Sequence, residues 1–209
     1  MFTRLMEIAN GIHRQNATGL ARLVSAILGP LQSDHLLSVA ERVQHAAVGA
    51  ASLERLFSPD YFFSLFDPSD CVQLRPEDYS VDLARDIVLS TPWNRNCFVN
   101  ALANIGSGRS CGTWRQDPNH AVSLVLPWRF GIVINGNHSI AAGILGREGV
   151  LTPSEVLDLT PLLNRVRCDG NHFVRRDSGE NIARIQNGRT AALFEIGRLM
   201  ATAQPSRGS

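Results

Sequence analysis

Apolar residues at helical spacing dominate the first part of the chain. They recur every three or four positions over residues 5–12 and again over residues 20–28. Gly29-Pro30 predicts the end of that second helix, because proline lacks the amide that a helix interior needs. The pattern then resumes and predicts a third helix over residues 34–53. We therefore expect an N-terminal helical region over residues 1–57.

A segment of different composition follows over residues 58–80. It is rich in Pro, Asp and Ser and contains Phe62, Phe63 and Phe66. This composition predicts an irregular connector that is held in place by burial of its aromatic rings. An exposed aromatic patch that binds a partner is the alternative.

Residues 81–160 alternate between strand and helix patterns. We predict a short strand over residues 85–90, a helix over 97–106, and two strands over 121–126 and 130–134. A polar turn over 135–139 then opens a helix of small residues.

Two further helices are expected towards the end of the chain. The sequence Thr152-Pro153-Ser154-Glu155 is typical of a helix start, and residues 178–203 predict a C-terminal helix. Residues 81–203 would then form the main domain, of the α+β class, with a small mixed sheet.

The basic residues exclude several kinds of chemistry. All 20 are arginine, so a P-loop lysine and a Schiff-base lysine are both impossible. The net charge is only +1, but residues 164–209 contain eight arginines against four acidic residues. This basic segment indicates either a solvated surface or one that faces phosphates.

Cysteine spacing and apolar run lengths set further limits. The four cysteines never form a C-x-x-C pair, which favours ordinary buried thiols over a zinc site. Charged residues interrupt the N-terminus, so we expect no signal peptide, and no apolar run is long enough to predict a membrane span. We expect a cytoplasmic protein, and leave open a position at the inner face of the inner membrane.

The turn over residues 135–139 holds the most specific local pattern. A strand, a glycine turn and a helix start together form an anion site, because unpaired amides and the helix dipole point at the ligand. Gly136 would allow close approach, Asn137 tolerates a left-handed backbone, and His138 and Ser139 would donate hydrogen bonds. An Asn-Gly pair is also typical of a plain hairpin turn, and local pattern leaves both interpretations open.

The order of elements from "DIVLSTPWN" through "FVNALANIG" to "FGIVINGNHSIAAGIL" resembles the ParB/sulfiredoxin superfamily. Gly136 to Ser139 stands where that superfamily has its phosphate-binding motif, and "GVLTPSEVLDL" is similar to the segment that follows it. The resemblance covers residues 81–160. With N-terminal helices before a lone ParB-like domain, the chain looks most like the plasmid fertility inhibition factors of the Osa and FiwA type.

That resemblance implies a protein that blocks DNA transfer through a type IV secretion system by ATP-dependent DNA cleavage. ATP phosphates would lie on Gly136, Asn137, His138 and Ser139, with His138 also catalytic. Ser139 stands where an arginine is usual, so another arginine, such as Arg129, would have to clamp the phosphates. The remaining nucleotide contacts are expected from the turn before the first helix of the domain, at Asn94 and Arg95.

An ATPase or nuclease of this kind also needs Mg²⁺. Glu155 and Asp158 would share one face of the expected helix and are the candidate metal ligands and catalytic acids. The alternative use of Glu155 is structural, as the last residue of a Thr-x-x-Glu capping box.

A second basic cluster is the candidate contact for DNA. Arg167, His172, Arg175 and Arg176 surround a Gly-Asn-His sequence and would bind the DNA backbone without sequence specificity. The other expected partner is a component of the secretion channel. A protein that inhibits this component by direct binding, without catalysis, is the alternative function.

Overall fold

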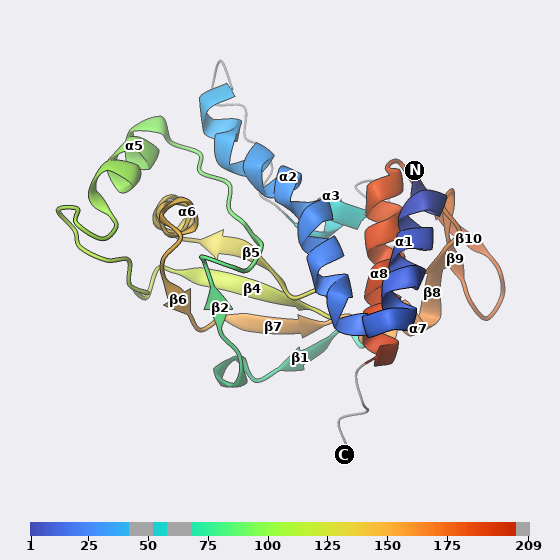
Figure 1. The fold of residues 1–209 in the computed structure, drawn as a ribbon. Coiled ribbons are helices and arrows are strands. Elements are labelled where there is room, and N and C mark those ends of the chain that lie inside the picture. The colour runs from blue at the N-terminus through green and yellow to red at the C-terminus, as the bar shows by residue number, and fades with distance from the viewer. Residues whose placement is uncertain (42–51, 58–67, 204–209) are drawn as a thin grey trace.

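The computed structural model describes residues 1–41, 52–57 and 68–203 of the chain (Figure 1). Its α-helices have the following bounds: α1 Phe2–Asn16, α2 Leu20–Glu41, α3 Leu53–Phe57, α5 Arg95–Asn104, α6 Asn137–Gly146, α7 Thr160–Arg165 and α8 Gly188–Ala203. Its strands are β1 Val72–Leu74, β2 Val81–Asp82, β3 Val88–Leu89, β4 Ala121–Leu126, β5 Phe130–Asn135, β6 Val150–Leu151, β7 Glu155–Asp158, β8 Val166–Cys168, β9 His172–Arg175 and β10 Asn181–Arg184. The mixture of helix and sheet confirms the expected α+β class.

A five-stranded mixed sheet organises the main body, in the order β1-β7-β4-β5-β3. Strands β4 and β5 form an antiparallel hairpin, whereas β3 pairs parallel to β5 and β7 pairs parallel to β4. Because β3 and β5 run in the same direction, their carboxyl ends meet at one edge of the sheet. The turns that lead into α5 and α6 therefore start side by side.

Each face of this sheet packs against a separate hydrophobic cluster. On one face, Val122 and Val133 pack with Ile140 and Ala141 of α6. On the other face, Ile132 joins a larger cluster formed with helices α1, α2 and α8. Both strands carry apolar residues on both faces, which is why β4 and the first four residues of β5 are largely buried, whereas Ile134 and Asn135 at the end of β5 are exposed.

The two ends of the described chain share that larger cluster. Ala9 of α1 and Leu20 of α2 are fully buried in it together with Ala191 and Phe194 of α8. Figure 1 shows α1 lying along α8, with the three-stranded sheet β8–β10 beside them. The N-terminal helices are thus packed directly onto the C-terminal helix.

Three expected element boundaries were wrong. Helix α2 continues through Pro30 to Glu41, because the apolar residues on both sides of the proline, Leu28 and Leu36, are buried on the same helix. No helix starts at Glu155, since residues 155–158 form strand β7 in parallel pairing with β4. Residues 181–184 form strand β10, so the C-terminal helix begins at Gly188.

The remaining expectations had mixed outcomes. The strands expected over 121–126 and 130–134 and the helix after the 135–139 turn are confirmed, and the short strand expected over 85–90 is confirmed as β3 at Val88–Leu89. The end of the third expected helix and the Phe62, Phe63 and Phe66 rings lie outside the described residues. After them, the connector forms the edge strand β1, which pairs with β7.

Candidate functional site

The predicted turn at residues 135–139 lies at the edge where β3 and β5 end. Gly136 has a left-handed backbone, with φ of 82°, and immediately precedes α6. A Cβ atom at this position would lie 2.6 Å from Cδ2 of His120, so only glycine fits the turn. The first backbone bond of the helix runs from the Ile140 amide to the Gly136 carbonyl at 3.0 Å. The amides of residues 137–139 therefore donate no hydrogen bond within the helix, and an anion site at a helix start needs such amides.

The Asn137 side chain ties this turn to the end of β3. Its Oδ1 accepts a hydrogen bond from the Thr91 amide at 2.6 Å and from the Ser90 hydroxyl at 3.2 Å. The same hydroxyl also donates to the Asn137 carbonyl at 2.8 Å. Ser90 and Thr91 are both buried, so Asn137 supplies acceptors for donors that water does not reach.

His138 makes a second tie to the same loop. Its Nε2 accepts a hydrogen bond from the Asn94 amide at 3.1 Å, and its ring contacts Trp93 edge to face at 5.4 Å between centroids. Burial lowers the pKa of His138, and an amide that donates to Nε2 requires this nitrogen to be unprotonated. The proton of the neutral ring is then on Nδ1, the nitrogen from which His138 would donate to a phosphate.

Ser139 contacts the opposite side of the turn. Its hydroxyl and carbonyl oxygens accept from the Trp114 indole N–H at 3.1 Å and 2.9 Å. The Trp114 ring stacks on His120 at 4.8 Å, and His120 in turn accepts from the Asp117 amide at 2.9 Å. Ser139 thus anchors the loop before β4 at the place where the resemblance leads one to expect a phosphate-clamping arginine.

The structure brings Asn94 to this site but directs the two arginines elsewhere. Asn94 caps α5 by accepting from the Cys97 amide at 3.0 Å. Arg95 reaches the end of α2, where its Nε donates to the Val39 carbonyl at 3.1 Å. Arg129 precedes β5 and lies at the opposite end of that strand from Gly136. Its guanidinium donates to the Ser80 carbonyl at 2.7 Å and pairs with Asp86 at 3.5 Å.

Glu155 and Asp158 do not form the predicted metal site. Both are on strand β7, where residues three apart point to opposite faces of the sheet. Glu155 accepts a hydrogen bond from the Ser123 hydroxyl, and Asp158 accepts from the Thr160 amide at 2.9 Å. Nowhere in the described ranges do three or more His, Cys, Asp or Glu side chains gather as metal ligands. The candidate carboxylates therefore do not fit a shared Mg²⁺, and the capping-box use of Glu155 was wrong as well.

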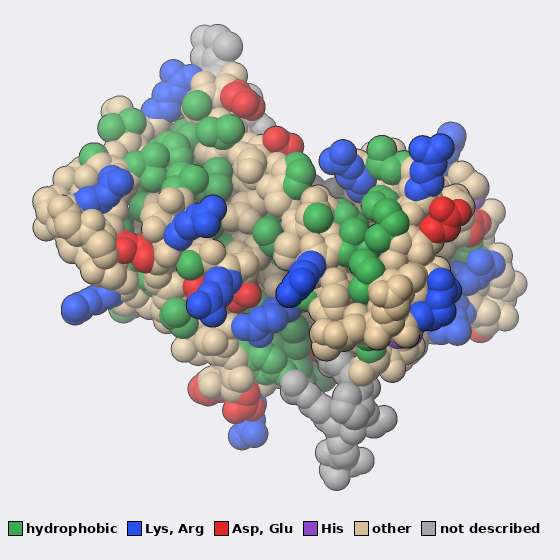
Figure 2. All heavy atoms as spheres, in the orientation of Figure 1, with side chains coloured by type: hydrophobic (Ala, Val, Ile, Leu, Met, Phe, Trp, Pro, Cys, Tyr) green, Lys and Arg blue, Asp and Glu red, His purple; other side chains and the backbone are tan. Residues whose placement is uncertain are grey.

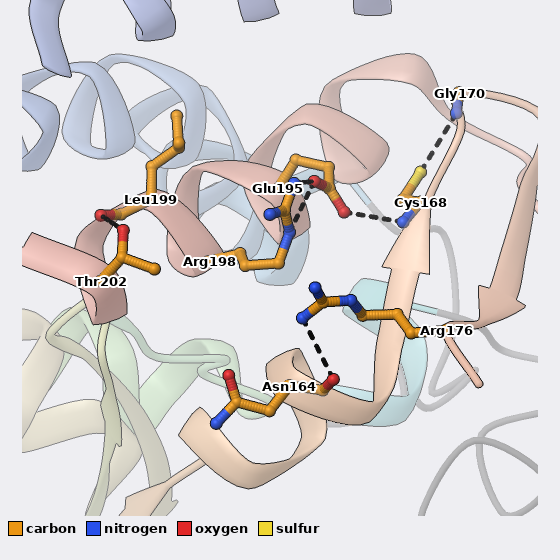
Figure 3. Close-up of polar contacts among 8 residues, drawn as sticks. All are labelled: Asn164, Cys168, Gly170, Arg176, Glu195, Arg198, Leu199 and Thr202. Atoms are coloured by element: carbon orange, nitrogen blue, oxygen red, sulfur yellow. Dashed lines mark hydrogen bonds and ion pairs between the residues drawn. The ribbon is translucent and has the colours of Figure 1, made fainter. Parts of the chain in front are cut away.

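The predicted DNA contacts lie on the small sheet β8–β10, remote from α6 (Figure 1). Arg167 pairs with Val174, two residues from His172, so Arg167 and His172 lie on the same face of this sheet. Arg175 is paired with Glu180 at 3.3 Å. Arg176 folds back and donates to the Asn164 carbonyl at 3.2 Å (Figure 3). Two of the four candidate side chains are therefore already used within the protein.

A buried acidic side chain lies beneath this sheet, where no sequence pattern pointed to it. Glu195 of α8 is only 3% exposed, and its carboxylate accepts from the Cys168 amide at 2.7 Å and from the Arg198 guanidinium (Figure 3). Burial raises the pKa of the Cys168 thiol to about 12, so this cysteine is not a reactive thiolate. The cluster attaches the small sheet to α8 and has the form of a structural network.

Exposed apolar side chains lie before α5, on α5 and on α2, and one of them, Trp93, contacts His138 of the site. Trp93 is 71% exposed and Val99 of α5 is 65% exposed, while Leu37 of α2 is 52% exposed. Figure 2 shows hydrophobic side chains gathered between α5 and α2 on the face that is drawn. Every helix within the described residues is too short or too polar to span a bilayer.

The protein thus combines helices and sheets, and its candidate site is a glycine turn at the start of α6 that is hydrogen-bonded to the neighbouring loop over residues 90–94. The chain belongs to a family of unknown function, DUF6710, which matches residues 1–207. No curated protein and no solved structure matches the chain.

Proposed function

We propose that the chain binds the phosphates of a nucleotide at the start of α6 and suppresses DNA transfer through a type IV secretion system. The geometry of the glycine turn at Gly136 carries the first half of the proposal. The second half rests on the resemblance to plasmid fertility inhibition factors, and in that resemblance the nucleotide is ATP and the activity is DNA cleavage. The protein would act in the cytoplasm, at the inner face of the inner membrane where such a channel opens.

Two features support phosphate binding here. The amides of residues 137–139 lie before the first internal bond of a ten-residue helix, and Gly136, the residue before the helix, provides no side chain to cap them. The loop from Ser90 to Asn94 lies against the same turn, so it would form the second wall of the site. The side chains of Asn137 and Ser139 hold these walls in position, and the backbone is left to contact the phosphates.

A pair of substitutions at Ser139 tests the site without disturbing the helix. Ser139→Asp keeps an oxygen that accepts from the Trp114 indole, and an acidic residue in the first turn of a helix is favourable. We expect this variant to fold as the wild type does but to bind ATP at least tenfold more weakly, because its carboxylate repels phosphate. Ser139→Arg restores the arginine of the resemblance and is expected to bind ATP more tightly, with Ser139→Ala as the uncharged control.

The measurements are ATP binding by calorimetry, ATP hydrolysis, plasmid nicking and suppression of conjugative transfer in cells. Equal ATP affinity in the Asp and Ala variants would refute the phosphate site. Absence of hydrolysis and nicking in the wild type would remove the enzymatic part of the proposal. Suppression that disappears only in Ser139→Asp would link the site to the biological role.

A non-catalytic inhibitor that binds a secretion component directly is the second candidate. It is favoured by the exposed Trp93 and Val99, which lie next to the site, and by the internal use of the Asn137 and His138 side chains. The double substitution Trp93→Ser and Val99→Ser removes this apolar surface. Loss of suppression with unchanged ATP binding would favour direct inhibition, whereas retained suppression would exclude it.

A further inference from the structure

A cavity of about 400 Å³ opens between α2, α3 and the start of α8. Its volume is within the range of roughly 300–1,000 Å³ that is typical of small-molecule sites. It belongs to the face of the sheet that packs against α2 and α8, so it is separate from the turn at α6. Nothing in the proposed function uses it.

The inner wall of the cavity is apolar. Leu28, Phe57 and Leu89 line it and are between 1% and 5% exposed, and the partly buried Leu31 lines it as well. These side chains come from α2, α3 and the end of β3, so the wall is fixed by the main hydrophobic cluster. Such a wall favours an aliphatic or aromatic group and disfavours a ligand that is polar throughout.

The mouth of the cavity carries the polar groups. Arg189 and Thr190, in the first turn of α8, both line it, and the Asn187 side chain accepts from the Arg189 amide at 2.8 Å. Among the described side chains, no acidic group forms an ion pair with Arg189. Asp34 lines the same cavity from α2 and is exposed. One carboxylate thus faces a guanidinium, a hydroxyl and the positive end of a 16-residue helix, which together favour a negative group.

We propose that this cavity binds a small amphipathic anion, with its apolar body against Leu31 and Phe57 and its acidic head on Arg189 and Thr190. A medium-chain carboxylate has this chemistry, and decanoate is the probe that we would use. Decanol and decylammonium have the same chain with a neutral or a positive head. Comparing the three separates the contribution of the head from that of the apolar wall.

The test is calorimetric titration of the full chain with each probe. We expect saturable binding of decanoate, and binding of decanol that is about tenfold weaker, because it lacks the charge-assisted hydrogen bond. Arg189→Ala should weaken decanoate binding by about tenfold and leave decanol unchanged. Arg184→Ala is the matched control, because Arg184 is an exposed arginine on β10 that does not line the cavity.

A further variant locates the binding. Leu31→Trp places a larger ring in the cavity and should abolish decanoate binding while Arg184→Ala retains it. The proposal is overturned if decanoate shows no saturable binding, if Arg189→Ala binds it as tightly as the wild type, or if a folded Leu31→Trp still binds it. Tighter binding of decylammonium than of decanoate would also overturn it, in favour of a cation held by Asp34.

Discussion

The Asn137 side chain has a structural role that can be separated from phosphate binding. Asn137→Ala removes the oxygen that accepts from the Thr91 amide at 2.6 Å, and Thr91 is only 6% exposed. The Ser90 hydroxyl keeps its bond to the Asn137 carbonyl, so one buried donor is left without a partner. Such a donor costs about 1–3 kcal/mol.

We therefore expect Asn137→Ala to lower the free energy of unfolding by about 2 kcal/mol. For a chain of this size the melting temperature should fall by roughly 4–8 °C. Asn137→Asp keeps both acceptor bonds and places a carboxylate at the start of α6, so its stability should stay within about 1 kcal/mol of the wild type. Urea denaturation and thermal melting followed by circular dichroism measure both effects.

The two variants should behave in opposite ways towards ATP. Asn137→Asp is expected to be stable but to lose ATP binding, because its charge would lie beside the proposed phosphate position. Asn137→Ala should retain binding at temperatures where it is folded. If Asn137→Asp is as unstable as Asn137→Ala, the side-chain oxygen is not what holds the loop. If Asn137→Ala lowers the free energy of unfolding by less than about 0.5 kcal/mol, the Thr91 amide finds another acceptor, and the structural role of the Asn137 side chain is refuted.

Two further predictions concern stability. Gly197→Ala should lower the free energy of unfolding by about 1–3 kcal/mol, because its Cβ would lie 2.3–2.5 Å from atoms of the buried Trp128 ring. Gly11→Ala, which has open space around it in α1, should raise the free energy of unfolding by about 0.5–1 kcal/mol. Urea unfolding of both variants tests this, and shifts of the same sign would contradict it. Burial lowers the pKa of His120 in the folded protein, so folding favours the neutral imidazole. The stability that neutral His120 provides is therefore fully present above the pKa of an unfolded histidine, about 6.5, and is lost as the pH falls below that value. His120→Asn should flatten the dependence of the urea midpoint on pH between about 7.5 and 5, and an unchanged slope would refute the assignment.

The sequence predicted the elements around the candidate site well because their signals are local. The runs of β4 and β5 are mostly apolar, and Gly136 marks the turn into α6, whereas α5 begins at Arg95, two residues before its expected start. These features are visible within a few residues of each other. The glycine turn and its helix start were therefore predictable from the chain alone.

The predictions that were wrong concern elements whose structure depends on residues far away in the chain. The Thr-x-x-Glu pattern at Glu155 is typical of a helix start, but pairing with β4 more than 30 residues earlier selects a strand. Likewise, Ser90 and Thr91 carry no signal that they hold Asn137, which lies 46 residues beyond Thr91 in the chain. The metal pair failed for the same reason, because its geometry assumed the helix that β7 replaced.

The packing of α1 and α2 on α8 has a consequence for synthesis of the protein. The cluster that includes Ala9 and Leu20 is closed by Ala191 and Phe194, so its first and last members are separated by most of the chain. Leu89, Val125 and Ile132 belong to the same cluster and are made earlier, but until α8 is made the first helices lack one side of the surface that buries them. The apolar surface that packs on α8 therefore stays exposed until that helix is made. A nascent chain that stalls before Gly188 therefore exposes apolar surface that chaperones and proteases recognise, and this surface is covered only once α8 is complete.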